Sequence, residues 1–202
     1  MTYTNRPRVV VSLYDFTGEA LRPWAERGYT CHAFDIQHPR EGTFSDGIHY
    51  RHADLHSRET LEDIKNEFKN GVAFAMAFPV CTDLAVSGAR HFKRKAEQDP
   101  HFQDVAAGHA MACAQLFDDL NVPFFIENPV SVLASVWRKP ACGVVAVFVC
   151  RQGSRSNLWI ASLNISSTAS SGVNLSAQKT YAALRHAVLL ARCARLTFYN
   201  EG

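Results

Sequence analysis

Two hydrophobic patterns alternate along the chain, and this alternation limits the possible folds more than any other feature. Short runs rich in β-branched and aromatic residues predict buried strands, and apolar residues at helical spacing predict amphipathic helices. The expected strands are residues 8–14, 29–36, 48–55, 71–78 and 122–129. The expected helices are residues 19–28, 57–70 and 102–120. Strands that alternate with helices favour an α/β fold, with a mostly parallel sheet and helices on both of its faces.

Each expected strand carries a polar residue at or just beyond its end. In open parallel sheets a ligand binds beyond the carboxyl ends of the strands. The candidate site residues are therefore Asp15 with Gly18, Asp35, Asp54, Cys81, and Glu127 with Asn128. A glycine turn lets a ligand approach the backbone, and an acid about 20 residues further on suits ribose hydroxyls. Plainer interpretations also exist: a cysteine is often core packing, an aspartate often caps a turn, and a glutamate often forms an ion pair.

Five segments, taken together, resemble the cytosine-C5 DNA methyltransferases over roughly Val9 to Trp137. They are "LYDFTGEALRPWAERGY", "AFDI", "HADL", "FPVCTDLAVSG" and "FIENP". The first is similar to the family's turn that holds S-adenosylmethionine (SAM), and the next two are similar to the segments that bind its ribose and adenine. The fourth is similar to the Pro-Pro-Cys motif and the fifth to the Glu-Asn-Val motif. The order and the spacing of the segments both agree with the family.

The resemblance implies a Rossmann-like SAM-dependent methyltransferase fold and an enzyme that methylates C5 of cytosine in DNA through a covalent Cys81 adduct. It implies SAM as the cofactor. The implied cofactor-binding residues are Asp15, Phe16, Thr17, Gly18, Asp35, Ile36, Asp54, Leu55 and Pro79. The implied catalytic residues are Cys81, Glu127 and Asn128, and the expected nucleic-acid contacts are Ser87, Arg90, Lys93 and Arg155.

The chemistry explains why such an enzyme needs these residue types. Cytosine C5 is a poor nucleophile until a thiolate adds at C6, and this is covalent catalysis by an activated cysteine. A carboxyl group at N3 offsets the charge that builds up during the addition, and Glu127 is the candidate. Basic residues 90–95 would favour the thiolate and meet phosphates, although a solvated basic face is the plainer interpretation. The target cytosine must be flipped out of a duplex or lie in a single strand, under a mobile loop around Ser87 and Gly88.

The second half of the chain departs from the family. The family's Glu-Asn-Val is Glu-Asn-Pro here, and its Pro-Pro-Cys is Pro-Val-Cys. The segment "RQGSRSN", which contains Arg155, is only weakly similar to the family's Gln-x-Arg-x-Arg strand. No acidic residue occurs between Lys139 and Asn200. We therefore expect a SAM-binding catalytic domain in residues 1–140 and an atypical basic segment in residues 141–202. That segment is either a nucleic-acid-binding extension or an out-of-frame or decayed remnant, and its acid-free, serine-rich composition fits a remnant better.

Composition limits the cellular setting. The hydrophobic fraction of 47% and the charged fraction of 20% are those of a soluble globular protein, without an apolar run of membrane-spanning length. The six cysteines are scattered, which predicts free thiols, and no metal site is expected. No signal-peptide pattern opens the sequence, so we expect the cytoplasm of a bacterial or phage-infected cell. Two alternatives to the DNA enzyme stay open: an inactive SAM- or nucleic-acid-binding protein with the same fold, and an RNA cytosine methyltransferase. The oligomeric state is left open.

Overall fold

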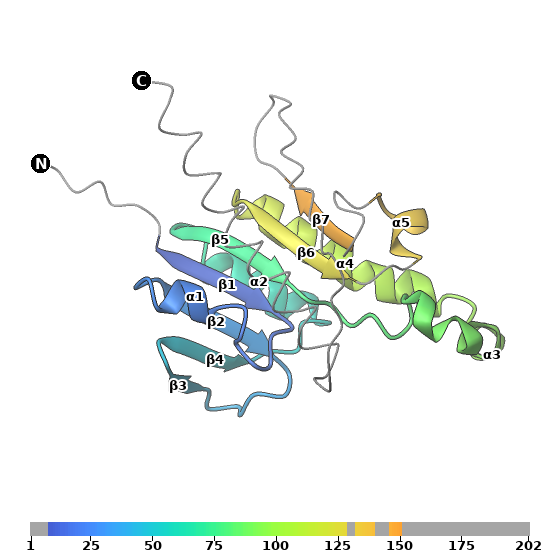
Figure 1. Ribbon diagram of the computed structural model, residues 1–202, viewed down its shortest axis with the longest axis horizontal. Helices are drawn as coiled ribbons and strands as arrows, with labels where there is room; N and C mark the ends of the chain where they lie inside the picture. The colour runs from blue at the N-terminus through green and yellow to red at the C-terminus, as the bar shows by residue number, and fades with distance from the viewer. Residues whose placement is uncertain (1–7, 129–131, 140–145, 151–202) are drawn as a thin grey trace, which may run out of the picture. The chain divides into compact units, whose positions relative to one another are not determined.

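A seven-stranded sheet forms the centre of the protein, in the strand order β3-β4-β2-β1-β5-β6-β7 (Figure 1). The structure, a computed structural model, describes residues 8–128, 132–139 and 146–150. The strands are β1 (Val9–Leu13), β2 (Thr30–Asp35), β3 (Thr43–Ser45), β4 (Ile48–His52), β5 (Val72–Ala77), β6 (Phe124–Asn128) and β7 (Ala146–Cys150). The five strands expected from the hydrophobic runs are all present, each trimmed at its ends.

The inner strands are parallel and the two edge strands are antiparallel. Strands β4, β2, β1, β5 and β6 run in one direction, whereas β3 pairs antiparallel with β4 and β7 pairs antiparallel with β6. The sequence did not predict β3, which is three residues long and fully exposed, because an exposed edge needs no hydrophobic pattern. Through β7, the sheet extends past residue 140, where the catalytic domain was expected to end.

The helices are α1 (Arg22–Ala25), α2 (Arg58–Glu67), α3 (Phe92–Gln98), α4 (Phe102–Asp119) and α5 (Leu133–Val136), with a 3₁₀ helix η1 (Val86–His91). Helix α2 begins where expected, because the Ser57 side chain accepts a hydrogen bond from the Thr60 amide. Helix α1 is much shorter than the expected residues 19–28. Gly28 (φ +74°) ends the segment, where the Tyr29 amide donates to the Trp24 carbonyl at 3.1 Å.

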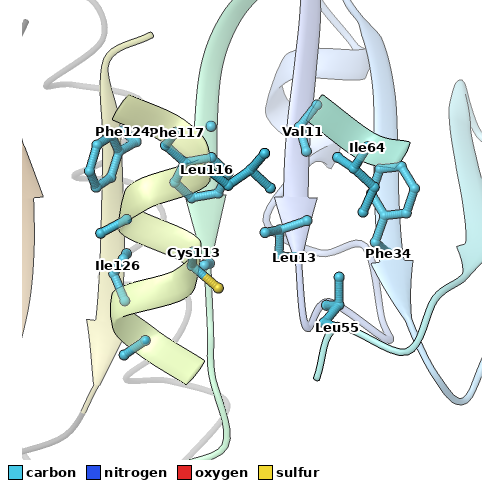
Figure 2. Close-up of a cluster of buried hydrophobic side chains, with 14 of the residues drawn as sticks. Val11, Leu13, Phe34, Leu55, Ile64, Cys113, Leu116, Phe117, Phe124 and Ile126 are labelled. Atoms are coloured by element: carbon cyan, nitrogen blue, oxygen red, sulfur yellow. The ribbon is translucent and has the colours of Figure 1, made fainter. Parts of the chain in front are cut away.

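The main hydrophobic core lies on one face of the sheet, under α2 and α4. Val11 and Leu13 of β1 point into it, as do alternate residues of β5 and β6, and they meet the apolar sides of the two helices (Figure 2). Small residues of α4, such as Ala107 and Ala110, let this helix approach the strands closely. On the opposite face, α1 places Trp24 in a stack on Phe74 of β5, with ring centroids 5.3 Å apart. Helices therefore cover both faces of a mixed α/β sheet that is compatible with a Rossmann-like fold.

The strand order reverses at β1. From β1 the chain proceeds outward through β2 and β4 on one side, and then returns to build β5 and β6 on the other side. The carboxyl ends of β1 and β5 therefore flank a topological switch point, the place where open α/β sheets bind their ligands. The turn after β1 and the Cys81 segment after β5 start at this point.

Candidate functional site

The turn after β1 is held by its own buried carboxylate. Asp15 accepts hydrogen bonds from the Gly18 amide at 2.8 Å through Oδ1 and from the Ser12 hydroxyl at 2.8 Å through Oδ2. Burial raises the pKa of Asp15, and these two hydrogen bonds oppose the rise. Gly18 has φ +68°, and a Cβ built there would lie 2.7 Å from the Tyr50 hydroxyl oxygen, so both conformation and space require glycine. Asp15 was expected among the cofactor-binding residues, but both of its oxygens are occupied in bracing the turn.

The rings of His38 and Tyr50 pack in sequence behind Phe16 of the same turn. Phe16 is 52% exposed and stacks on His38, with ring centroids 5.6 Å apart and an interplanar angle of 22°. The buried His38 ring packs edge-on against Tyr50 at 5.3 Å. Thr17, beside Phe16, is exposed, and its hydroxyl lies 3.4 Å from the Glu19 amide. The exposed face of Phe16 is therefore free to take a flat ligand, while its other side rests on His38.

The ends of β2 and β4 present the two other acids expected to bind a cofactor. Asp35 is buried at the end of β2, and its Oδ1 accepts from the Gln37 amide at 2.9 Å. The following Ile36 is 57% exposed. Asp54, after β4, is exposed, and its Oδ1 accepts from the His56 amide at 3.0 Å. Both interactions are turns of the kind that aspartates often make, and each leaves Oδ2 without a hydrogen bond to the described residues.

Leu55, the residue after Asp54, is a core residue rather than an exposed one. Its side chain is buried in the main core, and only its carbonyl oxygen serves the site region, by accepting from the Tyr14 hydroxyl at 3.3 Å. Tyr14 has φ +56°, a conformation that is costly for a bulky residue. This bond joins the turn after β1 to the segment after β4.

Cys81 lies at the switch point, half-buried, just beyond the carboxyl end of β5. The segment leaves the sheet in register with β1, because the Phe78 amide donates to the Leu13 carbonyl at 3.0 Å. Pro79 is buried and Val80 is exposed. The Cys81 carbonyl accepts from the Leu84 and Ala85 amides at 3.0 and 2.8 Å, which folds the chain back immediately after the thiol. The cysteine is therefore at a strand end, as expected, and not within the main core.

Glu127 brings a carboxyl group to the same place from the neighbouring strand. In the β5–β6 pair, Ala77 lies opposite Ile126, so Glu127 occupies the next position at the carboxyl end of β6. Burial raises the pKa of the Cys81 thiol, and the negative charge of Glu127 raises it further. Burial also raises the pKa of Glu127 itself. The expectation that residues 90–95 favour the thiolate is not met, because burial and Glu127 dominate the electrostatics of the thiol.

Asn128, next to Glu127, is fully buried with an unsatisfied amide. Its Oδ1 and Nδ2 both lack a hydrogen-bond partner among the described residues. A buried polar group without a partner costs about 1–3 kcal/mol. Such a group is expected where a side chain is retained for a reason other than stability.

The segment after Cys81 is helical rather than the expected open loop. It forms η1 and α3, and α3 buries none of its own residues. Lys95 of α3 pairs with Asp83, whose carbonyl accepts from the Gln103 side chain at 3.1 Å. Arg90 and Lys93 are exposed, and Arg90 donates to the His91 ring at 2.9 Å. The Ser87 side chain and Arg155 lie outside what the structure describes, so their expected contacts have no structural counterpart here.

Sequence reasoning missed His38 and Tyr14. Tyr14 lies within the segment that resembles the cofactor turn but has no role of its own in that resemblance, and His38 lies in a segment without hydrophobic periodicity. A histidine that follows the Asp35 strand end so closely was the one available signal. In the structure both residues brace the turn after β1, through the contacts given above.

Within residues 8–128, 132–139 and 146–150, no group of three or more His, Cys, Asp or Glu side chains could hold a metal ion. In the same part of the chain, no helix is both long and apolar enough to cross a membrane.

No protein-family model matches the chain, and no curated protein shows significant sequence similarity to it. The site therefore has to be interpreted from its own geometry and chemistry.

Proposed function

We propose that the protein is a SAM-dependent methyltransferase that modifies C5 of cytosine in DNA through a covalent bond to Cys81. The observation that carries the proposal is the pairing of Cys81 with Glu127. Cys81 lies just beyond the carboxyl end of β5 and Glu127 lies at the carboxyl end of the adjacent parallel strand β6, beside the switch point of the sheet, where burial and the charge of Glu127 raise the pKa of the thiol. Nucleophilic addition to a cytosine ring needs this pair of groups, one for C6 and one for N3.

The residues around the turn after β1 fit SAM. Phe16 offers an exposed aromatic ring for the adenine, and Ile36, just after β2, is an exposed apolar side chain. Asp35 and Asp54 each keep one carboxylate oxygen free of other described residues, as hydrogen-bond acceptors for ribose hydroxyls and an adenine amino group. Tyr50 occupies the space next to Gly18, where a dinucleotide fold leaves room for a pyrophosphate. This favours a ligand without phosphates. SAM, when bound, supplies an electrophilic methyl group.

In the proposed reaction Cys81 is the nucleophile and Glu127 is the acid. The Cys81 thiolate forms a bond from sulfur to C6 of the cytosine, and the electron pair of the C5–C6 double bond becomes available at C5. Glu127, as a neutral acid, donates its proton to N3 and so offsets the charge on the ring; its raised pKa suits that role. Bound SAM would supply the methyl group for C5. A base would then remove the C5 proton, the bond between sulfur and C6 would break, and N3 would return its proton to Glu127, which restores the neutral ring, the acid and the thiolate.

Cys81 is a protonated thiol before substrate binds, because its pKa is raised. In the resting protein the thiol holds its proton at neutral pH, so it must be activated when substrate binds. A proton that leaves the thiol for the Glu127 carboxylate, and then passes to N3, would serve both groups.

Duplex or single-stranded DNA is the proposed substrate. A base can reach Cys81 only when it leaves the stack, and the exposed basic residues of η1 and α3, among them Arg90 and Lys93, lie directly after the thiol in the chain. They are suited to phosphate contacts.

A methyl-transfer assay tests the proposal. The full chain is incubated with SAM carrying a tritiated methyl group and with cytosine-containing DNA, either duplex or single-stranded. We expect label in DNA for the wild type, none for Cys81→Ser, and a rate reduced by a factor on the order of 10²–10⁴ for Glu127→Gln. Thr82→Ala, an exposed neighbour of the thiol, is the control and should retain activity.

Two results decide between the alternatives: which nucleic acid becomes labelled, and whether the label depends on Cys81. Label that appears in RNA but not in DNA would move the assignment to an RNA methyltransferase. No Cys81-dependent label in either nucleic acid, from a chain that binds SAM, would identify a binding protein and overturn the enzymatic proposal.

A further inference from the structure

The turn after β1 is held by two aromatic residues from outside the turn. His38, beyond the end of β2, has its Nε2 3.2 Å from the Asp15 carbonyl oxygen. A carbonyl only accepts, so Nε2 carries the proton and donates. Tyr50, on β4, directs its hydroxyl to the Thr17 carbonyl at 3.4 Å. The carbonyls on either side of Phe16 are therefore both held from outside the turn.

The His38 ring also fixes the plane of Phe16. Its ring is nearly parallel to that of Phe16, at an angle of 22°, and lies at 71° to the ring of Tyr50. Phe16 is half-exposed, and an exposed phenylalanine without a stacking partner would sample several rotamers. Between Phe16 and Tyr50, His38 removes this freedom before any ligand arrives.

The position of His38 is itself well determined. Its side chain is 6% exposed, and its carbonyl oxygen accepts from His52 Nδ1 at 2.9 Å. His52 is the last residue of β4 and pairs in register with Asp35 of β2. The histidine is thus anchored to the two strands that carry the acids of the candidate cofactor site, and it transmits their placement to the turn after β1.

We propose that His38 is a positioning residue for cofactor binding, which orders Phe16 and the Asp15 carbonyl so that the adenosine part of SAM meets a preformed aromatic face. This inference rests on the proposed function. His38 does not touch the cofactor in this scheme; it acts through Phe16 and through the backbone of the turn. Preorganisation of this kind improves affinity by reducing the ordering that binding requires.

Three variants separate the two contributions of His38. His38→Phe keeps a flat ring under Phe16 and removes the hydrogen bond to Asp15. His38→Gln keeps a donor and removes the ring, and His38→Ala removes both. A hydrogen bond and an aromatic pair each contribute about 0.5–1.5 kcal/mol, which corresponds to a change in Kd of roughly 2- to 10-fold for each single loss. We expect the Ala variant to bind more weakly than either of the other two.

The measurement is calorimetric binding of SAM and of methylthioadenosine to the full-length variants, well below their unfolding temperatures. Methylthioadenosine contains the adenosine part without the amino-acid part, so its Kd and that of SAM should rise by the same factor. In methyl-transfer assays, KM for SAM should rise with kcat nearly unchanged. The matched control is His32→Phe, the same substitution on β2 at a residue that contacts Phe34 and Phe68 instead of the turn.

The outcomes are distinguishable. If wild type binds SAM and the His38 variants bind it equally well, or if His32→Phe weakens binding as much, the positioning role is wrong and the proposed function stands. If the wild type binds neither SAM nor methylthioadenosine, the proposed function fails, and the role of His38 fails with it.

Discussion

At the scale of single residues, burial and the Glu127 carboxylate set the pKa of the Cys81 thiol, just beyond the end of β5. Burial and the Glu127 charge both raise the pKa of Cys81 and so favour the protonated form of its thiol. A reactive thiolate that persisted without substrate would be open to oxidation, because susceptibility follows thiolate character. Under the proposed function, Glu127 would act on the ring and would also protect the resting thiol.

Replacing Glu127 should make the Cys81 thiol more reactive toward an alkylating agent while it slows the proposed methyl transfer. Glu127→Gln removes a negative charge and keeps the shape of the side chain, so the pKa of Cys81 should fall. The measurement is the pH dependence of iodoacetamide alkylation at the Cys81 peptide, followed by mass spectrometry. Glu59→Gln, in the first turn of α2, is the control and should match wild type. An alkylation profile for Glu127→Gln that is unchanged or shifted to higher pH would contradict the assigned coupling.

Gly18 is constrained twice, by its backbone and by Tyr50. Gly18→Ala should lower the free energy of unfolding by about 1–3 kcal/mol, because the left-handed φ and the overlap with the Tyr50 ring both oppose a side chain. Urea unfolding provides the measurement. In a Tyr50→Ala background the cost of Gly18→Ala should shrink, since only the backbone component then remains. Equal costs in both backgrounds would show that Tyr50 does not crowd the turn.

At the scale of elements, the pairing of β2 with β4 places two histidines face to face. His32 and His49 are opposite each other in register, and their rings stack at 4.8 Å. Burial lowers the pKa of His32 to about 4, and His49 and Arg51 contribute to the shift. The unfolded chain takes up a proton at this residue near its ordinary pKa of 6.5, and the folded chain does not.

This difference predicts a loss of stability in acid. Below about pH 6.5 the unfolded state binds more protons at His32 than the folded state, so stability falls as pH drops toward about 4. The contribution of this one residue is at most about 1.4 kcal/mol per pH unit. We expect His32→Phe to lose less stability than wild type between pH 6.5 and pH 4.5, as measured by urea unfolding at each pH. Parallel pH profiles for the two proteins would contradict the prediction.

Some elements follow from sequence pattern and others do not. The inner strands were predictable because burial on both faces gives continuous hydrophobic runs in the sequence. Helix α2 was predictable because Ser57 is a capping residue before apolar residues at helical spacing. The segment after Cys81 was expected to be a mobile loop because of its small residues, Ser87 and Gly88 among them, yet it forms η1 and α3. The Lys95–Asp83 pair and the contact of Phe92 with Phe102 hold it, and these are tertiary contacts that no local pattern reveals.

At the scale of the whole molecule, the site depends on where the sheet reverses its strand order. The polar strand ends were visible in the sequence, but their neighbours were not, because spatial strand order is set by packing. The structure puts β1 beside β5 and β5 beside β6, which joins Cys81 with Glu127 and leaves Asp35 and Asp54 on the β1 side. The occupied oxygens of Asp15 and the buried Leu55 could not be predicted either, since both depend on side-chain contacts made only in the fold.

Because β7 belongs to the sheet, we predict that a stable sheet needs residues beyond Lys139. It pairs antiparallel with all five residues of β6, the strand that carries Glu127 and Asn128. A chain cut after Lys139 would leave β6 as an unprotected edge. We expect it to be less stable than a chain cut after Arg155 by about 2–5 kcal/mol, from a few backbone hydrogen bonds of about 0.5–1.5 kcal/mol each. Coincident urea unfolding curves for the two truncated chains would show that β7 contributes nothing to the sheet.

Covalent capture of the base by Cys81 is the central claim, and trapping tests it directly. A DNA duplex and a single strand that contain 5-fluorocytosine are incubated with the full chain and SAM. The fluorine at C5 cannot leave as a proton does, so the bond between sulfur and C6 persists. We predict a denaturation-resistant protein–DNA complex whose adduct maps by mass spectrometry to the Cys81 peptide and is lost in Cys81→Ser. A chain that binds SAM but forms no adduct with either DNA, or forms one at another residue, would contradict the account.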